Sequence, residues 1–156
     1  MILYYAQYMD FTQLSEAFPL LDETSKSIYM KRIAVAYEPE GMEYTKELLK
    51  QLAPDHEIQL LTDGTPENTY AIGIGAEDKV NLAAEDRSQL REIYTQMRIQ
   101  SSKPIYLIHN HPATSDSFDT LPSPEDIEYF ATLPSGLIPA IYTNRTGNLL
   151  AYPYDA

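Results

Sequence analysis

Apolar residues recur every three or four positions over two long stretches of the chain, 42–53 and 86–100. This spacing places them on one face of a helix, so both stretches are predicted to be amphipathic helices. Pro54 is expected to end the first helix. The predicted apolar faces are Tyr44, Leu48, Leu49 and Leu52 in the first helix and Leu90, Ile93, Tyr94 and Met97 in the second.

Shorter apolar runs, bounded by turn residues, are typical of strands. Asp63-Gly64 and Asn144–Gly147 are turn signals, so the strands on either side of each are expected to pair as hairpins. Helices that alternate with strands predict an α/β domain, with a mixed β-sheet flanked by helices. The predicted strands are residues 33–37, 57–62, 70–74, 105–111, 137–142 and 149–152.

The first 29 residues show a different pattern. Phe11, Leu14 and Phe18 have helical spacing before Pro19, but no residue here indicates chemistry. We interpret residues 1–29 as an N-terminal extension that packs on the core, and residues 30–156 as one domain. A docking element for a partner or a second subunit is the alternative use of the extension.

Composition narrows the possible functions. The chain of 156 residues has no cysteine, which excludes disulfides, thiolate metal sites and cysteine nucleophiles. A formal net charge of −12 opposes binding to a nucleic acid backbone. No apolar run approaches the roughly 18 residues of a membrane span, and the first residues lack a signal-peptide pattern, so a cytoplasmic protein is expected.

The strongest chemical signal is a His-x-His pair at the end of a predicted buried strand. Strand alternation puts His109 and His111 on one side and Asn110 on the other. Two such imidazoles can converge on one Zn²⁺ ion. Ser123 and Pro124 are typical of a helix start that could bring Asp126 to the same ion.

The motif His109-Asn110-His111, followed by Ser123-Pro124-Glu125-Asp126, resembles the signature of the JAB/MPN (JAMM) metalloproteases. Its exact residues are most similar to those of the RadC-like and related prokaryotic JAB branch. The resemblance covers about residues 30–156. Eleven residues, 112–122, separate His111 from Ser123, whereas seven are usual in the family. The longer loop, residues 113–121, is expected to be exposed, and its Asp116 and Asp119 are alternative carboxylate ligands.

The resemblance implies a three-ligand zinc site of His109, His111 and Asp126, with Glu57 as the general base and Ser123 as a donor to the oxyanion. Glu57 is assigned because it follows the helix at 42–53 and opens the next strand. Glu67 and Glu77 also flank predicted strands and are the alternatives, and Glu57 could instead be an ordinary solvated residue at a strand end. The structural alternative for Ser123 is a helix N-cap.

The implied activity is that of a hydrolase, a zinc metallo(iso)peptidase that cleaves an amide or isopeptide bond of a protein or peptide, such as a ubiquitin-like conjugate. Two other functions are open. A RadC-like role in DNA repair or mobile elements fits the motif, but the negative net charge of the chain opposes it. A JAB-like interaction module without catalysis is the other alternative, and the long loop between His111 and Ser123 fits it.

Overall fold

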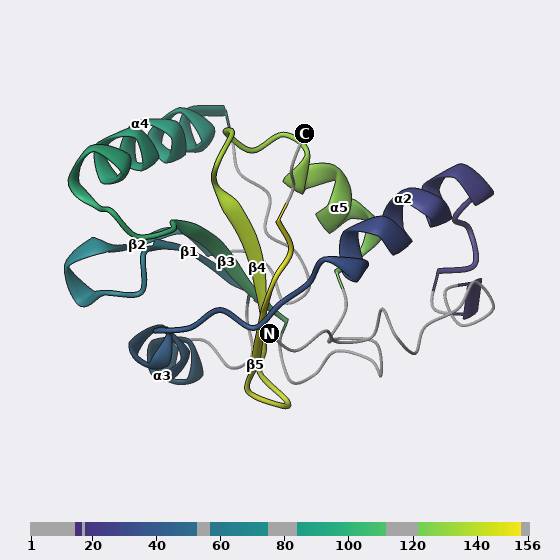
Figure 1. Cartoon of the computed structure of the whole chain (residues 1–156), viewed down its shortest axis with the longest axis horizontal. Helices are drawn as coiled ribbons and strands as arrows, with labels where there is room; N and C mark the ends of the chain where they lie inside the picture. The colour runs from purple at the N-terminus through teal and green to yellow at the C-terminus, as the bar shows by residue number, and fades with distance from the viewer. Residues whose placement is uncertain (1–14, 17, 53–56, 75–83, 112–121, 154–156) are drawn as a thin grey trace.

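A five-stranded β-sheet forms the centre of the computed structural model, which describes residues 15–16, 18–52, 57–74, 84–111 and 122–153 (Figure 1). The α-helices in these ranges include α2 (Glu23–Ala34), α3 (Glu43–Leu52), α4 (Ala84–Gln100) and α5 (Pro124–Phe130). The strands are β1 (Ile58–Thr62), β2 (Thr69–Ile74), β3 (Tyr106–His111), β4 (Ile138–Thr143) and β5 (Asn148–Ala151), with a short 3₁₀ helix η1 (Pro66–Asn68) before β2.

The sheet is mixed, with strand order β2-β1-β3-β4-β5. Only β3 and β4 run parallel, and the other three pairs are antiparallel. β3 is the central strand, and its residues are buried from Tyr106 to Asn110. A strand enclosed on both faces is continuously apolar, which is why residues 105–108 have no polar position.

Helices cover both faces of this sheet. On one face, Met42 and Leu49 at α3 pack against Ile58, Leu60 and Ile108. On the other face, α4 packs over Leu61 and Leu107, while α2 and α5 pack over Ile141 and Leu150. His109 pairs with Gln59 and His111 lies two residues further, so both histidines project from the face that carries α4 and α5.

The predicted α/β class with a mixed sheet is confirmed. The helices expected at 42–53 and 86–100 are α3 and α4, and both predicted hairpins form, as β1–β2 and β4–β5. The predicted inner face of α3 is confirmed at Leu48 and Leu49, which pack on the core, and is wrong at Tyr44, which is 40% exposed. Met42 and Thr45 are buried in its place. The side chain of Leu52 lies outside the described part.

The strand predicted at residues 33–37 is wrong. Ile33 and Ala34 end α2, and Tyr37 alone pairs, through an isolated antiparallel bridge to Ala151. The reason is a helix start upstream: the Asp22 side chain accepts a hydrogen bond from the Ser25 amide at 2.8 Å and caps α2. The β-branched and apolar residues that suggested a strand are therefore used as the buried end of a helix.

Helix α2 runs across residue 30, where the sequence suggested a boundary between extension and domain. Its Tyr29 and Ile33, one helical turn apart, are buried against α5 and the sheet. Phe18 packs on the Tyr29 ring, with centroids 5.4 Å apart. Phe11 and Leu14 lie outside the described residues. In the part of the chain that the structure describes, no helix is long and apolar enough to cross a membrane.

A buried carboxylate, Asp63, organises the turn between β1 and β2. It accepts hydrogen bonds from the Thr65 amide and hydroxyl, the Asn68 amide group and the Ser101 hydroxyl, the last of which ties the turn to the residue after α4. Burial raises the pKa of Asp63, but these donors together lower it below its ordinary value of 3.8.

We expect Asp63→Asn to lower the free energy of unfolding by about 2–3 kcal/mol at pH 7, because the amide that replaces one oxygen cannot accept. The folded-state pKa is depressed, so this stabilisation is present above the unfolded pKa and is lost as pH falls through the folded value. Urea unfolding at pH 7 and pH 3 should show the gap between wild type and variant narrowing in acid. The exposed Glu67→Gln should stay within about 0.5 kcal/mol of wild type, and an equal loss there would contradict the assignment.

Candidate metal-binding site

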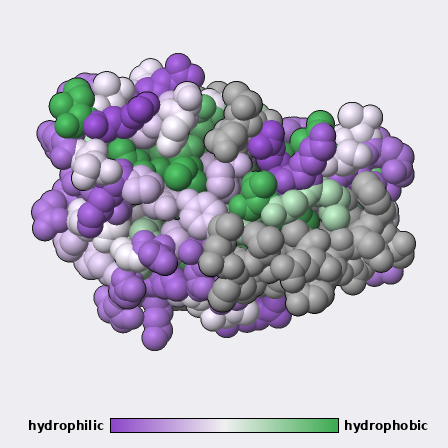
Figure 2. Space-filling model, in the orientation of Figure 1, coloured by the Kyte–Doolittle hydropathy of each residue, from purple (hydrophilic) through white to green (hydrophobic). Residues whose placement is uncertain are grey.

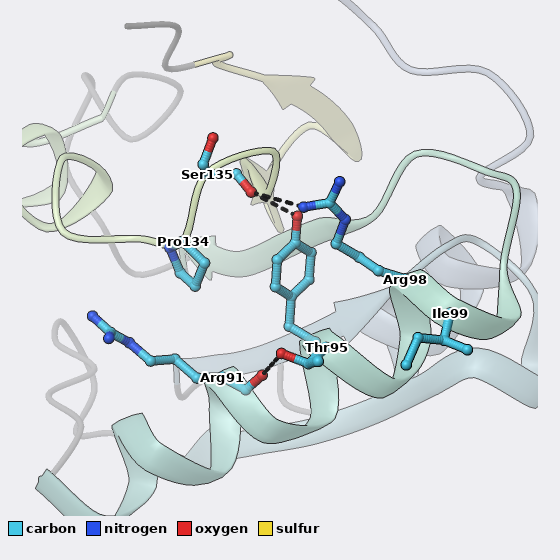
Figure 3. Close-up of a pocket in the computed structure, with 7 residues that line it drawn as sticks. Arg91, Thr95, Arg98, Ile99, Pro134 and Ser135 are labelled. Carbon is cyan, nitrogen blue, oxygen red and sulfur yellow. Dashed lines mark hydrogen bonds between the residues drawn. The ribbon is translucent and has the colours of Figure 1, made fainter.

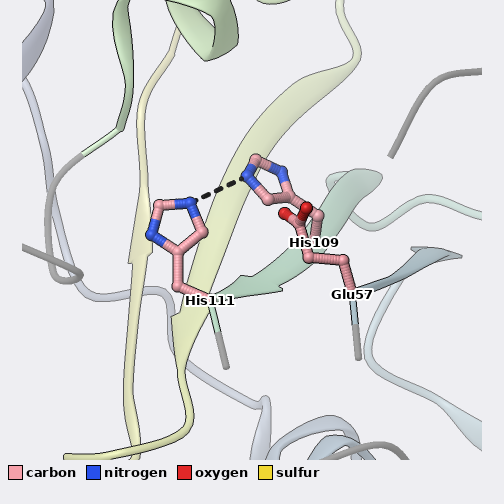
Figure 4. A group of neighbouring side chains, drawn as sticks. All are labelled: Glu57, His109 and His111. Carbon is pink, nitrogen blue, oxygen red and sulfur yellow. Dashed lines mark hydrogen bonds between the residues drawn. The ribbon is translucent and has the colours of Figure 1, made fainter. Parts of the chain in front are cut away.

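His109 and His111 project side by side from the end of β3 (Figure 4). His109 is 4% exposed and His111 is half-buried. Their Nε2 atoms lie 3.3 Å apart. The Phe130 ring of α5 lies 6.2 Å from the His109 ring, between centroids, and helps to enclose it. The predicted alternation, with both imidazoles on one side of the strand, is therefore what the chain adopts.

Helix α5 brings Asp126 to both histidines. Asp126 Oδ1 is 3.3 Å from His109 Nε2, and Oδ2 is 3.2 Å from His111 Nε2. The helix start predicted from Ser123 and Pro124 explains this placement: the Ser123 hydroxyl accepts from the Asp126 amide at 3.0 Å, and Asp126 Oδ2 accepts from the Ser123 amide at 2.8 Å. This reciprocal capping box fixes the carboxylate where the strand ends.

The charge state of Asp126 is set by these neighbours. Burial alone would raise the pKa of its carboxyl group. The charges and ring N–H groups of His109 and His111 outweigh burial and hold that pKa well below its usual range. The carboxylate is therefore ionised, which is the form that binds a cation.

Glu57 is the fourth group at this place. It immediately precedes β1 and is only 4% exposed, so it is not a solvated strand-end residue. A ligand atom of Glu57 and one from each histidine all lie within 4.8 Å of one another (Figure 4). Glu57, His109 and His111 together could hold a metal ion. Asp126 contacts Nε2 of the same two histidines, so His109 and His111 belong to both sets of possible metal ligands, one with Glu57 and one with Asp126.

The other residues considered from the sequence divide into two groups. Glu67 is exposed in η1, beyond the opposite end of β1 from Glu57, and does not belong to the cluster. Glu77, Asp116, Asp119 and the loop at 113–121 lie outside the described residues. The capping alternative for Ser123 is confirmed, and its hydroxyl still has a hydrogen to donate, because capping uses only an oxygen lone pair.

Asn110 holds this arrangement from the opposite side of β3. Its Oδ1 accepts from the Ile58 amide at 2.7 Å, and its Nδ2 donates to Asn144 Oδ1 at 2.6 Å. The first bond fixes the start of β1, and with it Glu57, next to the histidine strand. The second reaches the residue after β4, where the Asn144 amide also donates to the His111 carbonyl. Asn110 thus supports the site without facing it.

Sequence patterns did not indicate two further contributors. The Tyr29 hydroxyl of α2 donates to the Pro122 carbonyl at 2.6 Å, just before the capping box. Gln59, 1% exposed, lies beside His109 in the strand register and donates weakly to the Tyr129 hydroxyl at 3.4 Å. Its Oε1 accepts no hydrogen bond from the described residues. Both residues could have been recognised only from contacts between distant segments.

Comparison of the chain with family models, curated proteins and solved structures finds no match. The site is therefore interpreted from its own residues.

We expect wild-type protein to bind about one divalent ion per chain, measured by titration with Co²⁺, whose visible bands report its coordination. His109→Ala should abolish binding, because the two imidazoles are the shared donors. Asp126→Asn should weaken it at least roughly tenfold, since a neutral amide is a poorer ligand than a carboxylate. Unchanged affinity in both variants would contradict the site, and Glu67→Gln is the matched control.

Tyr29→Phe tests the support that α2 gives to the capping box. Loss of the hydroxyl leaves the buried Pro122 carbonyl without this donor, so unfolding should become easier by about 1–2 kcal/mol. Co²⁺ affinity should fall several-fold, since Asp126 would be held less firmly. Tyr44→Phe, at a 40% exposed position, is the control and should change neither value. Wild-type affinity in a destabilised Tyr29→Phe protein would show that α2 does not position the site.

Proposed function

We propose that this chain is a zinc-dependent hydrolase of amide or isopeptide bonds, similar to the JAB/MPN metalloproteases. The observation that carries the proposal is the convergence of His109, His111 and Asp126, with Glu57 beside them. A protein or peptide is the proposed substrate, with a ubiquitin-like conjugate as one case, and the cytoplasm is the proposed location.

The spacing of the donors favours zinc. Ligand atoms at about 2.0–2.1 Å from Zn²⁺ in tetrahedral geometry are roughly 3.3 Å apart. The two Nε2 atoms are 3.3 Å apart, and each has its own Asp126 oxygen at this spacing, Oδ1 at 3.3 Å from His109 and Oδ2 at 3.2 Å from His111. Two imidazoles and a carboxylate form a donor set that zinc enzymes use, and three protein ligands leave a fourth position for water or substrate. Bound zinc would supply a polarised carbonyl and a water of lowered pKa.

The remaining steps belong to side chains of the chain. Glu57, buried beside the histidines, takes a proton from the attacking water and delivers it to the leaving amine. Ser123 is held by its capping bond with its O–H hydrogen available, so it donates to the oxygen that gains negative charge. Asp126, held in place by the capping box, would be the third protein ligand beside the two imidazoles.

If Glu57 is the general base and Asp126 is a zinc ligand, neutral variants of the two residues should affect zinc affinity differently. Glu57→Gln keeps the size of the side chain but removes its basicity, so it should leave zinc affinity nearly intact while it lowers turnover about 10²–10⁴-fold. Asp126→Asn should lower zinc affinity and turnover together. The alternative, in which Glu57 is a ligand, requires Glu57→Gln to lose zinc as readily as Asp126→Asn does.

Activity can be sought without knowing the substrate. A peptide library made from digested cellular protein, and a second one carrying isopeptide-linked lysines, would be incubated with zinc-loaded protein, and new amine termini identified by mass spectrometry. Zinc-dependent cleavage that is absent in Glu57→Gln and retained in Glu67→Gln is expected. Full activity in Glu57→Gln, or no cleavage in either library by protein that holds zinc, would count against the proposed function.

A further inference from the structure

A groove runs along α4 (Figure 3). It lies on the same side of the sheet as the candidate metal site, because Tyr94 in its lining packs with Leu61 and Leu107, which share the sheet face of His109. Its volume is about 600 Å³, and it lies between residues 91–99 of α4 and the segment that leads from α5 to β4. Two further cavities, of about 340 and 60 Å³, adjoin it through shared residues. The groove is lined by Arg91, Tyr94, Thr95, Arg98, Ile99, Pro134 and Ser135.

The charge of this groove is opposite to that of the chain. Arg91 and Arg98, two helical turns apart, border it, and Lys103 lines the adjoining cavity at the end of α4. Among the described residues along these three cavities none is acidic, although the chain has 23 acidic and only 11 basic side chains. On the face drawn in Figure 2, hydrophilic side chains predominate and apolar patches are small. An acid-free basic groove on so acidic a chain attracts negative groups locally.

The Arg98 side chain is held in place by its neighbours. Its guanidinium lies over the Tyr94 ring, 5.6 Å from the centroid, and one nitrogen is 3.5 Å from the Ser135 carbonyl. The Tyr94 hydroxyl donates to the same carbonyl at 2.9 Å. These contacts use few of the five guanidinium N–H donors, so the remainder can meet a carboxylate at a small cost in side-chain entropy.

The groove also leads toward the metal site. Arg91 and Tyr129 line the same small cavity, and the Tyr129 hydroxyl contacts Gln59, which is paired with His109. One end of the basic groove is therefore connected to the neighbour of a metal-binding histidine through two side chains.

We propose that this groove binds an acidic polypeptide segment, with Asp or Glu side chains on Arg91 and Arg98. A polypeptide fits better than a small anion, because the groove combines two charges that lie two helical turns apart with apolar surface at Pro134 and at Ile99, and the Ile99 side chain is 78% exposed. The proposal rests on the proposed function, in that the segment would belong to the protein substrate whose scissile bond reaches His109 and His111.

The test is direct binding to metal-free protein, so it does not depend on cleavage. Anisotropy would be measured with a dye-labelled glutamate-rich peptide, its glutamine-substituted counterpart, and inorganic phosphate as competitor. The acidic peptide should bind, and more weakly as salt increases. Arg91→Gln and Arg98→Gln should each raise its Kd roughly tenfold, the loss expected for one charge-assisted contact. Lys50→Gln, which removes an exposed charge from α3 on the other face, should leave Kd unchanged.

The proposal would be overturned if the acidic peptide did not bind, or if the glutamine peptide bound as tightly as the acidic one. It would also be overturned if Lys50→Gln raised the Kd as much as the arginine variants do. Displacement of the peptide by micromolar phosphate would indicate a phosphate site instead. Circular dichroism and Co²⁺ affinity of the arginine variants should match wild type, which separates a lost contact from a lost fold. If the peptide binds as expected but no library peptide is cleaved, the groove assignment stands and the proposed catalysis fails.

Discussion

The candidate site depends on one buried side chain that does not face it. Asn110, near the end of β3, is joined through its two amide atoms to the start of β1 and to the residue after β4. Glu57 precedes β1, and the histidines lie at the end of β3. Without the bond from the Ile58 amide to Asn110, only the backbone pairing of β1 with β3 would hold Glu57 near the histidines. A buried amide with both ends satisfied specifies a single register, because any slip would leave its donor and acceptor unpaired.

Local signals in the sequence were sufficient where a single segment determines its own structure. The capping residues of α5, the alternation in β3 and the turn residues of both hairpins are each encoded within a few positions, and all were predicted correctly. The strand expected at residues 33–37 failed because a helix begun at Asp22 continues into it, so a start signal eleven residues upstream outweighs the local preference for a strand.

Other features could not be read from the sequence for a physical reason. The burial of Glu57, the bond from Tyr29 to Pro122 and the position of Gln59 beside His109 all arise between segments far apart in the chain. The arginines of α4 show the same limit. On the sequence they are ordinary charges on an exposed helix, and only the packing of residues 134–135 over that helix makes them the border of a groove.

The capping box has a consequence for how this sequence can change. At an ordinary capping box, the third helical position needs only a side chain that reaches back to the N-cap amide, and Glu or Gln commonly serves there. Asp126 lacks that freedom, because the same carboxylate closes the helix end and meets two imidazoles. A longer acid would overreach the histidines, and an amide would be a poor partner for a cation. A substitution that suits the helix end alone would therefore still disturb the contact with the histidines.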